Sequence, residues 1–490
     1  MHRFLRKFLL TMLFLSICSA LALWATVAIT HLAPGEVIGY TTGVLTGQKR
    51  LDGDRTPSEL VRYLQKRLQG HNRLESALLP TLLHFQSTTE RPPGNGPLPT
   101  LGKGQQTRPA GKNNAPPSML AASPEELLQA LKTLQAGQTL EILPGTYRLR
   151  GTVTTRNAGS PQAPIIVRAA KPGNVIIEFE TTEGFQVHHP YWIFENLLIR
   201  GVCKHDETCE HAFHVVGKAH HTTIRNNHIE NFNAHLKING NGAGDWPDDG
   251  LLEYNTLTNT RRRETHLPTT PFDLVGASRW LVADNIVSNF VKGHGDQISY
   301  GIFMKGAGSN GRIERNLVIC TPQDISQPGV RVGISFGSGG TGKAYCRDNG
   351  QCEAEHSGGI ASNNIVAHCN DFGIDINHSK NITIANNTLI NTSGIDVRRG
   401  PASARIYGNL LEGRIRARDG AQLKLEMNEI AKLQDIFEAP DALNLNWRTP
   451  PETIASTPLV THDFCNRPRA DATLPGAFSE AAPCPLPDNH

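Results

Sequence analysis

Charged, amide and apolar side chains alternate in a series of short segments between Phe213 and Arg418. Because neighbouring side chains of a β-strand point to opposite faces, we expect the apolar residues to point inward and the polar residues outward. Lysine and arginine on one outer face could bind the carboxylates of an acidic polymer, and aspartate and asparagine oxygens could hold a hard cation. The expected outward residues are His214, Lys237, Asn239, Asp273, Phe303, Lys305, Ser335, Asp375, Asn377, Asp396, Arg398, Arg416 and Arg418.

A six-residue motif, apolar-x-x-Asn-x-apolar, occurs nine times and predicts the elements that position these residues. Stacked coils pair each strand with those above and below at about 4.8 Å, and asparagines in register hydrogen-bond along the stack. The repeat therefore predicts an all-β fold, a right-handed parallel β-helix, with each asparagine at a bend. The asparagines are Asn196, Asn227, Asn255, Asn285, Asn316, Asn364, Asn387, Asn409 and Asn428, at separations of 19 to 48 residues.

Two stretches carry a resemblance to a known family. Residues Ala136–Tyr147, continued by Pro164–Ala170, resemble the first coil of the chondroitinase B and alginate lyase family of polysaccharide lyases. Near the C-terminus, Asp463–Phe464, Arg467–Arg469 and Pro475–Phe478 resemble the closing segment of exported β-helix proteins. The resemblance covers roughly residues 120–480, and it implies an acidic polysaccharide as the partner.

The resemblance assigns a role to Lys305, which lies eleven residues before Asn316. Its position is similar to that of the lysine these lyases use as a general base. A uronan lyase removes the proton beside a carboxylate, so a metal ion or an arginine must first neutralise that carboxylate. In the family, ligands on the preceding coils hold calcium. The resemblance therefore implies Ca²⁺ near Asn239, Asp273 and Asp296, although their spacing does not reproduce the family's acidic pair.

The sequence departs from the family on the next coil, where those lyases carry an arginine in an Arg-His-Gly-like strand. Gly333–Gly337 has no arginine or histidine in that register, and Arg331 is the nearby residue that could replace it. Alginate C5-epimerases are half matched by Phe372–His378. Asp375 fits their Asp-Pro-His-Asp strand, but the proline is missing and the histidine comes one position late.

Three functions therefore stay open. The first is a polysaccharide lyase that cleaves a uronic-acid-containing polymer by β-elimination. The second is a non-catalytic polysaccharide-binding or envelope scaffold, and the third is a uronan C5-epimerase. For the lyase we expect Lys305 and Arg331 as catalytic residues and Lys237, Phe303, Asp375 and Arg398 as substrate contacts; for the scaffold, the cationic contacts are Lys237, Lys305, Arg398 and Arg416.

The N-terminal residues predict export. Arg3, Arg6 and Lys7 precede an uncharged stretch of 23 residues, Phe8–Thr30, which is long enough to span a bilayer. Left uncleaved, it would anchor the chain in the inner membrane with the remainder in the periplasm; cleavage near Ser19–Ala22 would release a periplasmic or secreted protein. The predicted segments are the anchor or signal (1–30), a helical stalk (31–86), a flexible linker (87–118), the β-helix (119–430) with a helix at Glu125–Gln135, and a closing segment (431–490).

Eight cysteines follow the apolar stretch, and an even number in an exported chain indicates disulfides. Cys320 and Cys369 lie four and five residues after the asparagines of successive coils, so stacking should bring them within disulfide range. The other pairs are expected to be local: Cys203–Cys209, Cys346–Cys352 and Cys465–Cys484.

Composition excludes several classes of partner. The net charge of +3 and the lack of a long basic run argue against nucleic acid. Gly337–Lys343 approaches a phosphate loop, but Ala344 stands where serine or threonine must bind magnesium, so we expect no nucleotide. The sequence contains no Cys-x-x-Cys pair, so we expect no structural zinc site. We expect a monomer.

Overall fold

The computed structural model describes residues 77–82, 84, 116–322, 329–339 and 342–480. The predicted membrane segment and most of the predicted stalk and linker lie outside these residues. The chain divides into two units, residues 1–91 with 326–328, and the remainder. In the first unit the structure describes helical residues at 77–82 and 84. Within the described ranges, no helix is long and apolar enough to cross a membrane.

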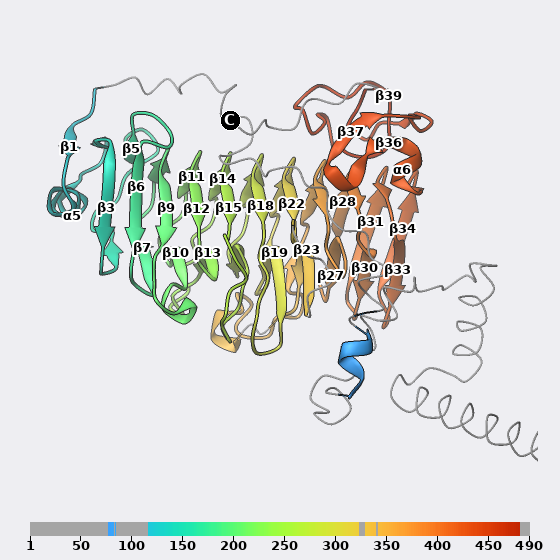
Figure 1. Cartoon of the computed structure of the whole chain (residues 1–490), viewed down its shortest axis with the longest axis horizontal. Coiled ribbons are helices and arrows are strands. Elements are labelled where there is room, and N and C mark those ends of the chain that lie inside the picture. Colours follow the sequence, from blue (N-terminus) through green and yellow to red (C-terminus); the bar gives the residue numbers. More distant parts are fainter. Residues whose placement is uncertain (1–76, 83, 85–115, 323–328, 340–341, 481–490) are drawn as a thin grey trace, which may run out of the picture. The chain divides into compact units, whose positions relative to one another are not determined.

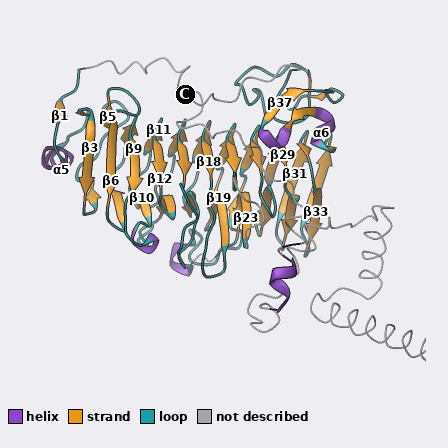
Figure 2. Cartoon of the chain, viewed as in Figure 1, coloured by secondary structure: helices purple, strands orange, loops and turns teal. Residues whose placement is uncertain are grey.

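Three long sheets, in which every neighbouring pair of strands is parallel, form the second unit (Figures 1 and 2). Each coil gives one strand to each sheet, as in the predicted right-handed parallel β-helix. Sheet A contains β1 (Met119–Ala121), β2 (Thr139–Ile142), β5 (Ile165–Ala169), β8 (Trp192–Glu195), β11 (Thr223–Arg225), β14 (Leu251–Glu253), β17 (Leu281–Ala283), β21 (Arg312–Glu314), β25 (Ile360–Ser362), β28 (Ile382–Ala385), β31 (Ser403–Tyr407) and β34 (Gln422–Glu426).

Sheets B and C complete the coils. Sheet B contains β3 (Gly145–Leu149), β6 (Val175–Phe179), β9 (Leu198–Gly201), β12 (His228–Glu230), β15 (Thr256–Thr258), β18 (Ile286–Ser288), β22 (Leu317–Ile319), β26 (Ile365–Ala367), β29 (Thr388–Ile390), β32 (Leu410–Leu411) and β35 (Glu429–Ile430). Sheet C contains β4 (Val153–Thr154), β7 (Glu183–Val187), β10 (His211–Val216), β13 (Ala234–Asn239), β16 (Phe272–Val275), β19 (Ile298–Lys305), β23 (Val330–Gly337), β27 (Ile374–Asn377), β30 (Gly394–Arg398) and β33 (Arg414–Arg418).

The predicted asparagine ladder is present from Asn227 to Asn428. Each side-chain amide nitrogen donates to the amide oxygen on the next coil, from 3.1 Å at Asn227–Asn255 to 2.8 Å at Asn409–Asn428. The prediction is wrong by one residue on the first coil. There Leu197 occupies the ladder position, and its N–H donates to Asn227 Oδ1. Asn196 instead pairs with Asn226 at the preceding bend, where both residues have positive φ.

The start of the β-helix carries a short helix, α5 (Pro124–Thr133), where the sequence predicts one. The Ser123 hydroxyl accepts from the Glu126 N–H at 3.2 Å, which caps the first turn. Leu127, Ala130 and Leu131 are buried against the first coil. The helix therefore closes the apolar interior at this end.

The segment after the last coil covers the outer face of sheet B. It contains α6 (Leu433–Ile436) and the antiparallel pairs β36 (Phe437–Ala439) with β37 (Asn444–Trp447) and β38 (Ile454–Ala455) with β39 (Ala472–Thr473). Phe437, Phe464 and Phe478 pack with Ile319 and Leu410 of sheet B in one apolar cluster. The C-terminal segment therefore covers the outer face of sheet B at this end. The polar side chains lie on the outer face of sheet C. The remaining elements are β20 (Gly308–Ser309), paired with β24 (His356–Ser357), and 3₁₀ turns at Asp206–Thr208, Lys343–Tyr345 and Pro440–Ala442.

Three of the four predicted disulfides are observed. Cys320 and Cys369 pair across successive coils with Cα atoms 4.9 Å apart, which confirms the register of those coils. Cys203–Cys209 and Cys346–Cys352 close local loops. Cys465 is also disulfide-bonded, and its predicted partner Cys484 lies outside the described residues.

Candidate functional site

The outer face of sheet C carries two rows of side chains in register. The apolar residues predicted to point inward are fully buried, so the alternation is as the sequence predicts. One row, in chain order, is His214, Lys237, Asp273, Phe303, Ser335, Asp375, Asp396 and Arg416. The second row includes Asn239, Val275 and Lys305, and then Asn377, Arg398 and Arg418.

Two lysines share one buried carboxylate at the middle of this face. Lys237 Nζ lies 2.5 Å from Asp273 Oδ2, and Lys305 Nζ lies 3.3 Å from Asp273 Oδ1. Lys305 Nζ also donates to the Gly339 carbonyl at 2.8 Å and lies 4.4 Å from the centre of the Phe303 ring. Strands β13, β16 and β19, which pair in this order, supply the three charged groups.

Burial and charge set the protonation of this cluster. Burial lowers the pKa of Lys305; the charge of Asp273 opposes this shift, and the charge of Lys237 adds to it. Burial alone would raise the pKa of Asp273, but the two ammonium groups hold it well below its usual range. Asp273 is therefore a fixed negative charge, and Lys305 loses its proton more readily than an ordinary lysine.

The two lysines differ in exposure. The Lys237 side chain is 24% exposed, against 8% for Lys305. The insertion that follows β23 brings Gly339 against the Phe303 ring, where a Cβ would lie 2.7 Å from the nearest ring carbon. Tyr300 stacks on Phe303 with ring centres 4.2 Å apart. Phe303 is thus buried, and it supports Lys305 rather than offering the polymer contact that the sequence predicts.

Aspartate–arginine pairs continue along the face beyond Lys305. Asp375 accepts two hydrogen bonds from Arg398, each 2.9 Å long. Asp396 pairs with Arg398, Arg416 and Arg418. Arg398 and Arg416 lie on the predicted face, but two buried carboxylates partly neutralise them. Asp375 is itself buried, so its predicted contact with substrate would pass through Arg398.

A stretch of this chain, residues 121–241, matches the sequence model of the chondroitinase B family. The solved structure of pectate lyase Pel9A is 15% identical, and the alignment covers 75% of this chain and 97% of that chain with a TM-score of 0.53. This similarity shows the fold. The chain resembles the chondroitinase B and alginate lyase family. A search of curated proteins finds no match.

Two further structures align less closely. An alginate lyase from Paenibacillus sp. str. FPU-7 is 14% identical, with coverage of 64% of this chain and 94% of that chain and a TM-score of 0.36. The A-module of the Azotobacter vinelandii mannuronan C-5 epimerase AlgE4 is 12% identical, with coverage of 64% and 93% and a TM-score of 0.41.

Arg331 is the predicted replacement for the arginine that the family carries after its lysine. It lies at the start of β23, in register with Ser299, and it is only 1% exposed. Its backbone N–H donates to Asn370 Oδ1 at 2.9 Å, which fixes the strand at this point. A catalytic role for Arg331 stays a prediction, and the burial of its side chain argues against contact with a polymer on the outer face.

The residues predicted to hold calcium do not form a cation site. Both oxygens of Asp273 face lysine ammonium groups, and Asn239 Oδ1 lies 2.8 Å from His214 Nε2. Asp296 is 60% exposed and pairs with Lys292 at 2.7 Å. Calcium prefers six to eight oxygen ligands, and here it would meet two positive charges at its only buried carboxylate. The arrangement does not fit calcium, so no step below passes through a metal.

We expect chelation to leave polymer binding and turnover unchanged, since Asp273 already has two ammonium counter-ions. Affinity and initial rate before and after dialysis against EDTA measure this. A loss that added calcium restores would contradict the expectation.

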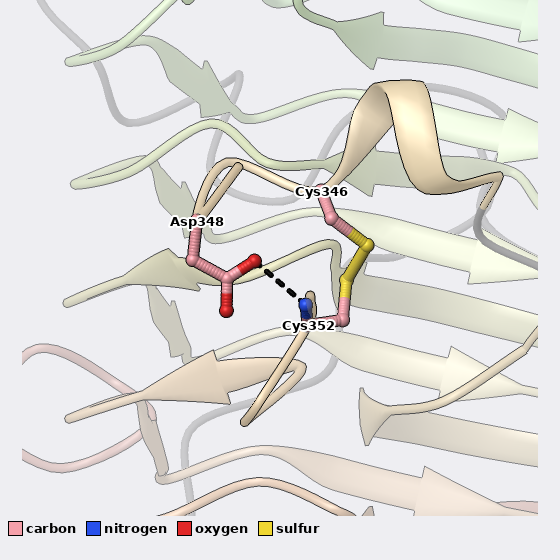
Figure 3. A group of neighbouring side chains, drawn as sticks. All are labelled: Cys346, Asp348 and Cys352. Atoms are coloured by element: carbon pink, nitrogen blue, oxygen red, sulfur yellow. Dashed lines mark hydrogen bonds between the residues drawn. A yellow bond between two sulfur atoms is a disulfide. The ribbon is translucent and has the colours of Figure 1, made fainter. Parts of the chain in front are cut away.

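A second group of residues of the types that bind metals lies in the insertion after β23 (Figure 3). It consists of Cys346, Asp348 and Cys352, and these residues already bond to one another. The two sulfur atoms form a disulfide, and Asp348 accepts from the Cys352 N–H at 2.6 Å. With both thiols oxidised, this group cannot coordinate a metal. It instead stiffens the insertion whose Gly339 carbonyl contacts Lys305.

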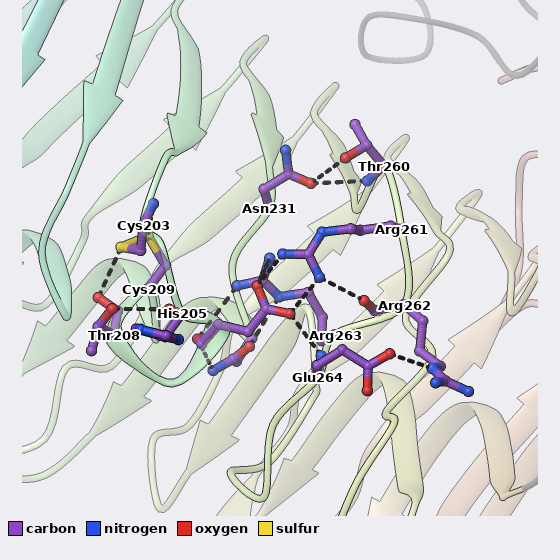
Figure 4. A network of polar contacts seen from close by, with 12 residues as sticks. Cys203, His205, Thr208, Cys209, Asn231, Thr260, Arg261, Arg262, Arg263 and Glu264 are labelled. Atoms are coloured by element: carbon purple, nitrogen blue, oxygen red, sulfur yellow. Dashed lines mark hydrogen bonds and ion pairs between the residues drawn. A yellow bond between two sulfur atoms is a disulfide. The ribbon is translucent and has the colours of Figure 1, made fainter.

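Sequence reasoning missed an ion-pair network around the buried Asp206, which joins two loops beside sheet C (Figure 4). Asp206 accepts from Arg261 at 2.7 Å and from the Glu264 N–H at 2.6 Å, and it lies 3.0 Å from Arg263. Burial alone would raise the pKa of Asp206, but these groups hold that pKa below its usual range. The network joins the loop before β10 to the loop before β16, and so positions the strands of His214 and Asp273.

Sequence reasoning also missed the partner of His214, which lies on the predicted face without an assigned role. Glu183 Oε1 is 2.9 Å from His214 Nδ1. Glu183 lies on β7, before the segments between Phe213 and Arg418 from which the polar face was predicted.

Proposed function

We propose that this protein is an exported polysaccharide lyase that cleaves a uronic-acid-containing polymer by β-elimination. The observation that carries the proposal is the pair of lysines on Asp273, on the outer face of sheet C. A base for this reaction must be neutral near working pH and must lie beside a second positive charge that attracts the substrate carboxylate. Burial lowers the pKa of Lys305 toward that of such a base, and Lys237 supplies the neighbouring positive charge.

In this proposal the polymer lies along sheet C, across successive coils. Lys237, the more exposed lysine, contacts the carboxylate of the reacting uronate and stabilises the charge that develops when the neighbouring carbon loses its proton. Lys305 accepts that proton. Arg398 and Arg416, farther along the same face, bind carboxylates of neighbouring sugars.

The test is incubation with alginate, chondroitin, dermatan and pectic polymers, monitored by the ultraviolet absorbance of unsaturated uronate ends. Growth of this absorbance with one polymer supports the lyase. Polymer binding without it would overturn the lyase in favour of a scaffold. Exchange of the proton beside the carboxylate, with inversion and without new chain ends, would instead indicate an epimerase.

One observation favours the scaffold as the second candidate. The Lys305 ammonium is 8% exposed and already contacts Asp273 and the Gly339 carbonyl, so a polymer must displace the carbonyl to reach it. A scaffold would need only the more exposed cations, Lys237, Arg398 and Arg416.

We further propose that the domain works outside the cytoplasm, as an inner-membrane-anchored periplasmic protein or, after cleavage, as a free one. The disulfides support this, since such bonds persist in oxidising compartments. We expect membrane fractions to contain the full-length chain. A soluble form that begins near Leu23 would contradict the anchor and favour cleavage.

A further inference from the structure

His214 lies on the outer face of sheet C, one coil before Lys237, with both ring nitrogens engaged. Nδ1 is 2.9 Å from Glu183 Oε1, and Nε2 is 2.8 Å from Asn239 Oδ1. The other Glu183 oxygen accepts from Gln186 Nε2 at 2.7 Å, which fixes the carboxylate. His214 is thus held between two neighbouring coils by groups that are themselves held.

The groups that face the two ring nitrogens of His214 are both hydrogen-bond acceptors. The Asn239 amide nitrogen donates to the Gly240 carbonyl at 2.8 Å, so it is the amide oxygen that faces the imidazole. A carboxylate oxygen faces the other nitrogen. A neutral imidazole has one donor and one acceptor, and only the imidazolium can donate to both. The geometry therefore favours a protonated His214, with Glu183 as its counter-ion.

His188, His211, Glu210 and Lys237 lie around His214, and Lys237 is in register with it on the next strand. The ring centre of His211 is 5.4 Å away, and burial lowers its pKa to about 3, so it is neutral near pH 7. Burial and the charge of Glu183 raise the pKa of Glu210. On the coil after Lys305, the residue in register with Phe303 is Ser335, which is buried.

The reach of the two side chains brings acid and base close together. Lys305 extends back one coil to Asp273 on β16, and His214 extends forward one coil to Asn239 on β13. The two side chains thus reach toward each other and contact two neighbouring strands, β13 and β16. A base and an acid that approach from opposite directions along the face can act on neighbouring atoms of one sugar linkage.

We propose that His214 is the general acid of the elimination, a role that rests on the proposed lyase function. Lys305 takes the proton from C5, and the electrons of that C–H bond form the double bond between C4 and C5. The bond from C4 to the glycosidic oxygen breaks, and its electron pair stays on the oxygen. That oxygen replaces Asn239 Oδ1 as the acceptor and takes the Nε2 proton. Water then returns both residues to their starting states.

Glu183 acts as a positioning residue in this scheme. A carboxylate on Nδ1 orients the ring and stabilises the imidazolium, as the aspartate of a Ser-His-Asp triad does. Asn239 Oδ1 accepts from Nε2 until the polymer oxygen takes its place.

The decisive test compares two leaving groups. On the polymer that the wild type cleaves, His214→Gln should lower kcat/KM by roughly 100- to 10,000-fold, the contribution of a general acid. On a uronide with nitrophenoxide at C4, which leaves without a proton, the same substitution should have an effect of less than about tenfold. Lys305→Met should lose activity on both substrates, and His205→Gln, at an exposed histidine, on neither. An equal loss for His214→Gln on both substrates, or no loss, overturns the acid role.

A second measurement does not depend on turnover. Nitrogen-15 shifts of the His214 ring, assigned with His214→Gln, should report both nitrogens as protonated near pH 7. Glu183→Gln should shift the ring toward the neutral form. A neutral ring in the wild type overturns the proposal even if the protein is a lyase. A protonated ring in a protein that forms no unsaturated ends means that the lyase function failed, while the assignment of the imidazolium stands.

Discussion

Replacing Lys305 with methionine should lower turnover of the cleaved polymer by roughly 100- to 10,000-fold, the range that a positioned general base contributes. Methionine keeps most of the length of the side chain and removes the amine. Polymer affinity should change by only a few-fold, because Lys237 and Arg398 remain. Initial rates of unsaturated-end formation and the polymer dissociation constant measure the two effects.

The matched control is Lys424→Met, at a lysine whose side chain is 68% exposed on β34. It should leave both rate and affinity unchanged. In Lys305→Met, Asp273 keeps Lys237 as an ion-pair partner, so we expect the fold to be retained. The thermal unfolding temperature of the variant checks this. A Lys305→Met variant with wild-type turnover would remove Lys305 from the mechanism.

The direction in which the cleavage rate changes with pH tests whether Lys305 is the base. The rate should rise with pH as Lys305 loses its proton, through a pKa below the ordinary lysine value. Lys237→Met removes the neighbouring positive charge and leaves Asp273 to stabilise the protonated Lys305. The rising limb should therefore move to higher pH in Lys237→Met. No shift would argue that another group is the base.

The coil architecture could be predicted because its signal is local and repeated. An asparagine every coil, with apolar residues at fixed offsets, specifies a bend and an inward face without knowledge of distant residues. The same register brought Cys320 and Cys369 together correctly. It failed at Asn196 because the bend residue is also asparagine on some coils, and the motif cannot distinguish the bend from the ladder position that follows it.

The site could be predicted only in outline. Alternation placed Lys237, Asp273 and Lys305 on one face, but not the fact that both lysines share the carboxylate. Burial of Phe303 depends on the insertion after β23, which belongs to no repeat. The sequence also did not show that the side chain of Arg331, on β23 of sheet C, is almost fully buried.

The same contacts explain why a charge count overestimates the cationic face. Arg398, Arg416 and Lys237 each have a buried aspartate partner, so the face contains fixed pairs with few isolated cations. Paired cations hold their side chains in place before a polymer arrives, which reduces the entropy lost on binding. A sequence shows the charges but not these partners, because the partners lie 20 to 36 residues away on other coils.

Asn316→Ala should lower the free energy of unfolding by about 3–5 kcal/mol, the largest stability effect that we expect from one ladder position. Asn316 is fully buried. Its Nδ2 donates to Asn364 Oδ1 at 3.0 Å and to the Val282 carbonyl at 2.9 Å, and its Oδ1 accepts from the Asn285 N–H at 3.0 Å. Alanine would leave these buried groups without partners and without access to water, at about 1–3 kcal/mol each.

The last asparagine of the ladder provides the matched comparison. Asn428 donates to the Ile406 carbonyl at 2.8 Å and accepts from Asn409, but it is only partly buried on the last coil. Water can replace its hydrogen bonds, so Asn428→Ala should cost about 1 kcal/mol. Urea unfolding followed by circular dichroism measures both variants. Equal losses of unfolding free energy at the two positions would contradict a ladder whose contribution depends on exclusion of water.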